Sequence, residues 1–352
     1  MATSHLIFFG TYTRTTSRGI YAARLDDETG VLSAPALVAE TPSPTWIELS
    51  PDKKRLYAVH ASKAQVIGFE VDATKPALRP LPLPPWATEA AGSACHIAID
   101  ATGRALIAAN YGAGFVASMA IQPDGTLSEP TIIQHSGHGP NPQRQEKPHV
   151  HSATISPDNR FVVVCDLGLD RLFTYALDPA TARLTPASPA YVEAQPCSGP
   201  RHFKFSRDGR YAYNVTEMGA TTVAYDYNAA TGALSQTQIV STLPADYQAK
   251  WGAEIRIHPN GKFVYASNRG HDSMAVFAVD STSGQLTLVE IVPSGGKVPR
   301  NFALSPNGTW LVCAHQESGD VTVFHVDADS GKLTLMPSRQ NVAMGVCVAF
   351  YD

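Results

Sequence analysis

The sequence predicts an all-β protein, a seven-bladed β-propeller with four-stranded antiparallel blades whose ring is closed by N- and C-terminal strands sharing one blade. Three observations predict this fold. A hairpin pattern recurs six times, a third and a fourth strand follow each copy, and the two ends of the chain supply strands for a seventh unit. We expect the 352 residues to form one propeller domain, 1–352.

The recurring unit is a hairpin of a short strand, a polar turn and a strongly apolar strand. Its windows alternate at period two or run apolar over a few residues, which is typical of strands and not of helices. Successive copies start 47 to 56 residues apart, and four strands in about 50 residues is the length of a propeller blade. The copies are ELSPDKKRLYAVH (48–60), AIDATGRALIAAN (98–110), TISPDNRFVVVCD (154–166), KFSRDGRYAYNVT (204–216), RIHPNGKFVYASN (256–268) and ALSPNGTWLVCAH (303–315).

The remaining strands complete each blade. A third strand such as TTVAYDYN follows each hairpin, and a turn such as ATGAL leads into a weaker fourth strand. At the chain ends, GVCVAFYD is typical of a first strand, and LIFFGTYT and GIYAARLD of a second and third. Pairing these ends in one blade would close the ring and remove free sheet edges, which promote aggregation.

Composition excludes several classes of function. Charged residues make up 16% of the chain, and the net charge of −4 offers no basic surface for nucleic acid or an anionic membrane. No apolar run approaches the ~20 residues of a membrane-spanning helix, and the start, MATSHLIFFGTYT, lacks the basic segment of a secretory signal. Five cysteines without a CxxC pair favour a reducing compartment. We expect a cytoplasmic monomer or weak dimer with no nucleic-acid or membrane partner.

The hairpins carry polar residues at their free ends. In GPRHFKFSRDGRYAYNVTEM (199–218), an arginine and a histidine open the hairpin and a glutamate closes it. The first strand of a propeller blade lines the central channel and the second lies beside it, so both free ends meet at one mouth of the channel. Centring this hairpin on its Asp-Gly turn places Arg201 opposite Thr216, one residue from Glu217.

The other hairpins can be centred on their turns in the same way. This pairs His151 with Asp166, Cys95 with Asn110, Thr45 with His60, Gly252 with Arg269, and Arg300 with His315. The residues at the mouth differ from blade to blade, as a site for an asymmetric small molecule requires. They are His96, Asn110, Tyr111, His149, His151, Asp166, Arg201, His202, Glu217, Glu254, Arg269, Arg300 and His315.

At these residues the sequence resembles the seven-bladed lactonase family that includes bacterial 6-phosphogluconolactonases and fungal carboxy-muconate cyclases. The resemblance covers the chain from Leu6 onward and is carried by HSATISPDNR (151–160), GPRHFKFSRDGRYAYNVTEM (199–218), WGAEIRIHPNGKFVYASNR (251–269) and VPRNFALSPNG (298–308). It implies lactone chemistry without a metal or other cofactor. The family's motif positions that carry it fall on His151, Arg201, Glu217 and Arg269.

One segment departs from the 6-phosphogluconolactonase branch of that family. QHSGHGPNPQRQEKPHVHS (134–152) is long and polar, and it supplies a second histidine, His149. A long loop beside the mouth is a place where specificity can diverge. The spacing of His149 and His151 could also serve a metal, but the sequence fixes no third ligand, and we expect none.

The catalytic candidates supply what lactone hydrolysis needs. Glu217, flanked by arginines, would be ionised and act as base or orienter, and His151 could exchange protons with water or the leaving alkoxide. The guanidinium forks suit a phosphate, a carboxylate or an oxyanion. The candidate substrate contacts are His149, Asn110, Tyr111, Asp166, Glu254, Arg300 and His315.

Structural roles compete with these chemical ones. Arg201 and Glu217 could be a salt bridge that staples one blade, and Asn110 and Tyr111 could shape a turn. For three histidines a hydrogen-bonding role inside the channel is favoured: His96, His202 and His315.

Three functions remain open from the sequence. The first is a lactonase of carbohydrate metabolism, acting on 6-phosphogluconolactone of the pentose phosphate pathway or a related aldonolactone. The second is a cyclase that interconverts a carboxylated muconate and its lactone. The third is a non-catalytic propeller that binds proteins. The charged mouth, different in every blade, favours an enzyme with a small anionic lactone as its partner.

Overall fold

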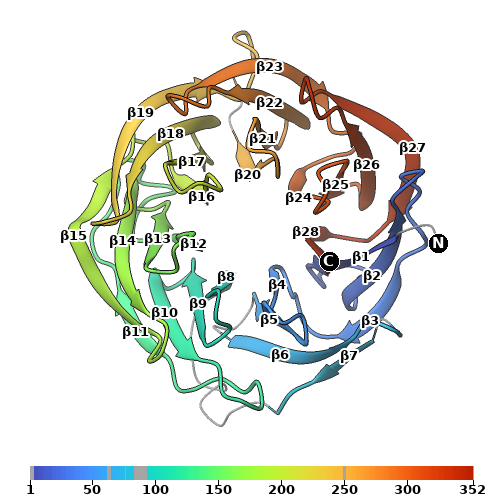
Figure 1. Ribbon diagram of the computed structural model, residues 1–352, viewed down its shortest axis with the longest axis horizontal. Helices are drawn as coiled ribbons and strands as arrows, with labels where there is room; N and C mark the ends of the chain where they lie inside the picture. The colour runs from blue at the N-terminus through green and yellow to red at the C-terminus, as the bar shows by residue number, and fades with distance from the viewer. Residues whose placement is uncertain (1–3, 62–64, 76, 83–92, 249–250, 352) are drawn as a thin grey trace.

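Seven four-stranded antiparallel sheets stand around a central channel like the blades of a propeller (Figure 1), which confirms the predicted fold class. The computed structural model describes residues 4–61, 65–75, 77–82, 93–248 and 251–351. No helix in these described ranges is long and apolar enough to cross a membrane.

Six blades are built from consecutive strands, which run from the channel outward in chain order. The first two are β4 (Ile47–Leu49), β5 (Arg55–His60), β6 (Gln65–Asp72) and β7 (Ala77–Pro80), then β8 (Ala94–Ile99), β9 (Ala105–Asn110), β10 (Phe115–Ala120) and β11 (Thr131–Gln134). The next two are β12 (Val150–Ile155), β13 (Phe161–Asp166), β14 (Arg171–Asp178) and β15 (Arg183–Glu193), then β16 (Pro200–Phe205), β17 (Tyr211–Thr216), β18 (Thr221–Asn228) and β19 (Ala233–Ser241). The last two are β20 (Gly252–Ile257), β21 (Phe263–Asn268), β22 (Ser273–Val279) and β23 (Leu286–Pro293), then β24 (Pro299–Leu304), β25 (Trp310–His315), β26 (Asp320–Val326) and β27 (Leu333–Asn341).

The seventh blade joins the two ends of the chain. Its strand order is β28 (Gly345–Phe350), β1 (Ser4–Thr11), β2 (Gly19–Asp26) and β3 (Ala36–Glu40), so the last strand lines the channel and the first pairs with it. Phe8 lies opposite Ala349 in this pairing. The predicted closure is therefore confirmed, and the inner strand of each described sheet pairs with a second strand.

Neighbouring blades are tied by buried tyrosines on their second strands. Each hydroxyl donates to a carbonyl in the turn between the third and fourth strands of the next blade. The hydroxyl group is thus hydrogen-bonded, while the aromatic ring of the tyrosine fills the space between two sheets. The pairs are Tyr57 with Gly125 (2.8 Å), Tyr213 with Gly284 (2.9 Å) and Tyr265 with Gly331 (3.0 Å). This repeated tie fixes the blades relative to one another and so holds the channel open.

A β-bulge interrupts the first strand of six blades at the mouth end. The predicted register holds in the arms, for example between His202 and Val215, but the bulge then shifts it by one residue. Thr216 therefore pairs with Pro200, not with Arg201 as predicted. The same correction applies to four further pairs: Asp166 pairs with Val150, Asn110 with Ala94, His315 with Pro299, and Gly252 with Asn268.

In the first of the six predicted hairpins, which joins β4 and β5, Ile47 pairs with Ala58 on the predicted register. The strand pairing stops there, before it reaches Thr45 and His60.

Candidate active site

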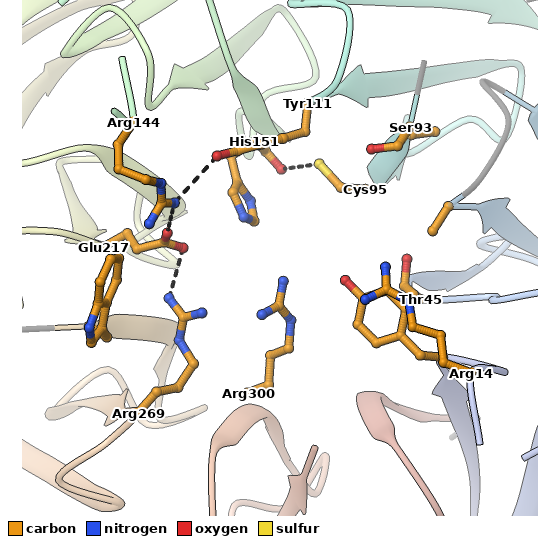
Figure 2. Close-up of a pocket in the computed structure, with 14 residues that line it drawn as sticks. Arg14, Thr45, Ser93, Cys95, Tyr111, Arg144, His151, Glu217, Arg269 and Arg300 are labelled. Carbon is orange, nitrogen blue, oxygen red and sulfur yellow. Dashed lines mark hydrogen bonds and ion pairs between the residues drawn. The ribbon is translucent and has the colours of Figure 1, made fainter. Parts of the chain in front are cut away.

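One mouth of the channel opens into a pocket of about 450 Å³ (Figure 2). Its walls come from several different blades and from the connections between them. The lining residues are Tyr12, Arg14, Thr45, Ala61, Ser93, Ala94, Cys95, Tyr111, Arg144, His151, Glu217, Trp251, Arg269 and Arg300.

The bulges explain how strand residues reach this pocket. Cys95, His151, Arg201 and Arg300 are the extra residues that the bulges insert between two ladder pairs. A bulge re-aims a side chain that a regular strand would direct into the sheet interface, and such bulges are common beside active sites. The polar mouth is thus built where strand pairing is interrupted.

Glu217 is the centre of a cluster of three arginines. Its Oε2 lies 3.0 Å from Nε of Arg201 and 2.8 Å from Nη2 of Arg269, and its Oε1 lies 2.5 Å from Nη2 of Arg144. The Glu217 and Arg201 side chains are only 5% and 3% exposed, whereas the Arg144 side chain is 30% exposed. Arg201, Glu217 and Arg269 are predicted to lie at one mouth, and the structure places all three in one network.

The cluster sets the protonation of Glu217. Burial alone would raise the pKa of this carboxyl, but the charges of Arg269 and Arg201 outweigh it and hold the pKa well below its usual 4.5. Burial, followed by the charges of Arg269 and Arg300, lowers the pKa of Arg201 to about 9. Glu217 is therefore ionised and weakly basic, which suits an orienter of guanidinium groups better than a general base.

His151 provides a neutral imidazole in the same pocket. Burial, then the charges of Arg201 and His202, lowers its pKa well below the usual 6.5. Its ring packs edge-on against Tyr111 at 5.6 Å, and its buried Nδ1 has no hydrogen-bond partner among the described residues. The ring is unprotonated at neutral pH and can accept a proton, and its Nδ1 without a partner distinguishes it from Glu217, whose two oxygens are both held by arginines.

A second polar layer lies beneath this pocket. Glu254 is fully buried, and its Oε2 lies 3.0 Å from Nδ1 of His202 and accepts a hydrogen bond from Asn301. His96 packs against Trp46 at 4.0 Å and does not line the pocket. Glu254, predicted as a substrate contact, thus contacts protein groups in the channel.

Other predicted contacts are also placed outside the lining. Oδ1 of Asn110 accepts a hydrogen bond from the amide of Ala113 in the turn after its strand. Nδ1 of His315 donates to the carbonyl of Asp320 over 3.0 Å. His149 stacks against Tyr111 with ring centroids 4.4 Å apart, so it supports the pocket wall from behind.

Asp166 holds the long segment 134–150 in place. Its Oδ2 accepts from Nδ1 of His135 over 2.7 Å, and its Oδ1 accepts from the amide of His149 over 2.8 Å. One buried carboxylate therefore ties both ends of the segment. Between these ends, Gln145 is fully buried and donates to the carbonyl of Leu167, while its neighbour Arg144 reaches Glu217.

Sequence reasoning missed four large lining residues, namely Tyr12, Arg14, Arg144 and Trp251. Arg144 lies in the long polar segment 134–152, and Trp251 opens one of the motif segments. Tyr12 and Arg14 follow the first strand of the chain, where no six-fold hairpin pattern marks the mouth. In the described ranges no group of three or more His, Cys, Asp and Glu side chains is arranged to hold a metal ion.

The chain is similar to known proteins along almost all of its length. A family model described as lactonase, 7-bladed beta-propeller, matches residues 6–350. A 6-phosphogluconolactonase of Bacillus subtilis (strain 168) is 37% identical over 99% of both chains, and one of Formosa agariphila is 29% identical over 85% of this chain and 86% of its own. Among solved structures, a periplasmic gluconolactonase of Pseudomonas aeruginosa superposes with a TM-score of 0.92 at 31% identity over 99% of each chain.

Proposed function

Because the chain belongs to the seven-bladed β-propeller lactonase family and is itself a lactonase, we propose that its substrate is an anionic sugar lactone. 6-Phosphogluconolactone is the first candidate, since it is the substrate named for the Bacillus and Formosa relatives. A related aldonolactone is the second, since the Pseudomonas relative is named a gluconolactonase.

The positive charge of the pocket is the observation that supports an anionic substrate. Among the described residues, four arginines line the pocket and a fifth, Arg201, lies directly behind Glu217, which is the only acidic residue that these residues contribute to the lining. Guanidinium groups that are partly removed from water and outnumber their carboxylates repel one another. A phosphorylated or carboxylated ligand would relieve that repulsion, and the same field would attract it from solution.

In the proposed reaction His151 is the general base. Its neutral imidazole takes a proton from a water molecule as the water oxygen adds to the lactone carbonyl carbon. The carbonyl oxygen becomes an oxyanion, which a pocket guanidinium such as that of Arg269 stabilises. The bond between the carbonyl carbon and the ring oxygen then breaks, and the imidazolium returns its proton to the leaving alkoxide.

Glu217 acts through the arginines in this scheme. Its two oxygens hold three guanidinium groups, so the donors are oriented before the substrate arrives. Preorganised donors stabilise the developing charge without reorganising during the reaction. We also propose a cytoplasmic reaction of the pentose phosphate pathway, which a phosphorylated substrate would require.

The test is a pH-stat assay with three substrates: 6-phosphogluconolactone, glucono-δ-lactone and a carboxymuconolactone. We expect hydrolysis of the first to be fastest and His151→Ala to lower kcat by about 10²- to 10⁴-fold, the usual contribution of a general base. Turnover of the carboxymuconolactone alone would favour the cyclase instead. Wild-type turnover by His151→Ala on every hydrolysed lactone would remove His151 from the mechanism.

A further inference from the structure

Two of the pocket arginines have no acidic partner among the described residues. Arg201, Arg269 and Arg144 share Glu217, whereas neither Arg14 nor Arg300 forms an ion pair within the part of the chain that the structure describes. Arg300 is only partly exposed, so its charge is removed from much of the surrounding water. A desolvated cation without a counter-ion is costly to the folded state, which indicates that a ligand supplies the negative charge.

The two unpaired arginines meet on one aromatic ring. Cζ of Arg14 lies 4.3 Å from the centroid of the Tyr12 ring, and Cζ of Arg300 lies 5.8 Å from the same centroid. A guanidinium that packs on an aromatic face keeps its hydrogen-bond donors free at its edges. Tyr12 therefore holds both cations in place without using up their donors.

This pair is separated from the Glu217 cluster within the pocket. In Figure 2, Arg14 and Thr45 lie on one side, Glu217 with Arg144 and Arg269 lies on the other, and Arg300 points into the space between. The hydroxyl groups of Thr45 and Ser93 also belong to the lining and offer further donors. The pocket thus has one side where three arginines share the carboxylate of Glu217, and one side where two arginines form no ion pair with any described residue.

We propose that Arg14 and Arg300, packed against Tyr12, form the subsite for a phosphate monoester at the end of the substrate. The inference rests on the proposed lactonase function and adds which residues recognise the substrate's anionic group. Two uncompensated guanidinium groups match the charge of a phosphate monoester, which is close to −2 at neutral pH. Planar guanidinium forks bind phosphate oxygens in pairs, and nearby hydroxyls can bind the third oxygen.

Arg144 is a weaker candidate for this role. Its Nη2 already lies 2.5 Å from Oε1 of Glu217, and its Cζ lies 4.9 Å from the Trp251 ring centroid. One of its donors is therefore already engaged, and its orientation is fixed on the opposite side of the pocket. Arg14 and Arg300 at Tyr12, which form no ion pair with any described residue, therefore keep more donors available for an anionic group.

The variant Arg14→Gln tests this subsite, because Arg14 is exposed and its removal does not disturb the core. We expect kcat/KM for 6-phosphogluconolactone to fall about 10- to 100-fold, as for loss of one charged hydrogen-bonding group. For glucono-δ-lactone, which lacks the phosphate, kcat/KM should change by less than about twofold. The matched control is Arg18→Gln in the same connection between β1 and β2, since Arg18 is exposed and paired with Glu40.

An equilibrium titration separates failure of the subsite from failure of the function. The probes are the open-chain products 6-phosphogluconate and gluconate, which are bound without being hydrolysed. We expect wild type and Arg18→Gln to bind 6-phosphogluconate more tightly than gluconate, and Arg14→Gln to lose that preference. Equal losses for both probes, or an unchanged preference in Arg14→Gln, would overturn the subsite. An intact preference in a wild type that hydrolyses neither lactone would overturn the proposed substrate and leave the subsite standing.

Discussion

Nε of Arg201 donates to Oε2 of Glu217 over 3.0 Å, between two side chains that are at most 5% exposed. Breaking a buried ion pair by removing one partner is strongly destabilising, because the other charge stays buried without compensation. Here the same carboxylate also serves Arg269 and Arg144. Glu217 therefore supports the fold of the mouth as well as its chemistry.

We predict that Glu217→Gln lowers the free energy of unfolding by about 3–5 kcal/mol, the usual loss for half of a buried pair. Urea unfolding followed by fluorescence measures it. The control is Glu193→Gln, which removes the partner of Arg171 from an exposed pair at 3.3 Å and should cost under about 1 kcal/mol. Equal losses in the two variants would mean that the carboxylate does not hold the arginine cluster together.

The pH dependence of activity should reflect the neutral state of His151. Its pKa in the folded protein lies well below 6.5, mainly because of burial, so the ring is deprotonated at pH 7 and stays so as the pH falls through 6.5. Protonation removes the base, so kcat/KM should be flat from about pH 8 to pH 6.5 and decline only at lower pH. A pH-stat series on 6-phosphogluconolactone checks this. A decline already centred at pH 6.5 or above would contradict a depressed pKa or the role of His151.

Much of the fold could be predicted because each blade has the same pattern of turn residues and apolar strands. Each hairpin carries its own turn residues and apolar strand, so the number of blades and the pairing in their arms follow from local patterns. The closing blade could be predicted because the C-terminus supplies a first strand and the N-terminus supplies a second and a third strand. The register near the mouth did not follow, because a bulge inserts one residue without leaving a distinct pattern in the sequence.

Only the site residues that lie within the recurring hairpins could be predicted from the sequence. His151, Arg201, Glu217 and Arg269 lie at the ends of recurring hairpins, and the structure brings them into or against one pocket. Arg144 was missed because a connection of irregular structure carries it there. No periodicity specifies which side chain of such a connection points into the pocket.

The position of Arg144 should depend on Asp166, which ties the two ends of its segment. We predict that Asp166→Asn loosens residues 135–149, because an amide cannot accept on both atoms from His135 and from the amide of His149. Hydrogen exchange should accelerate in this segment and leave the blade strands protected. Asp178→Asn is the control, since Asp178 makes similar hydrogen bonds in an exposed turn far from the segment. Unchanged exchange in Asp166→Asn would show that the segment is held by its other contacts.

The last prediction concerns the tautomer of His202. Nε2 of this ring lies 3.3 Å from Nη1 of Arg201, and a guanidinium can only donate, so Nε2 must accept. The ring proton then sits on Nδ1 and is donated to Oε2 of Glu254 over 3.0 Å. Burial, then the charge of Arg201, lowers the pKa of His202 well below 6.5, so the ring is neutral at pH 7.

NMR of the protein with ¹⁵N-labelled histidine should therefore show His202 with its proton on Nδ1 at pH 7. In Glu254→Gln the side-chain amide can donate to Nδ1 instead, which would move the proton to Nε2 and point it at Arg201. We expect that variant to lose kcat with little change in KM, since His202 and Glu254 lie behind the pocket and orient a guanidinium without lining the cavity. A proton on Nε2 in the wild type would contradict the arrangement, and a variant with the shifted proton but full kcat would show that Arg201 does not depend on it.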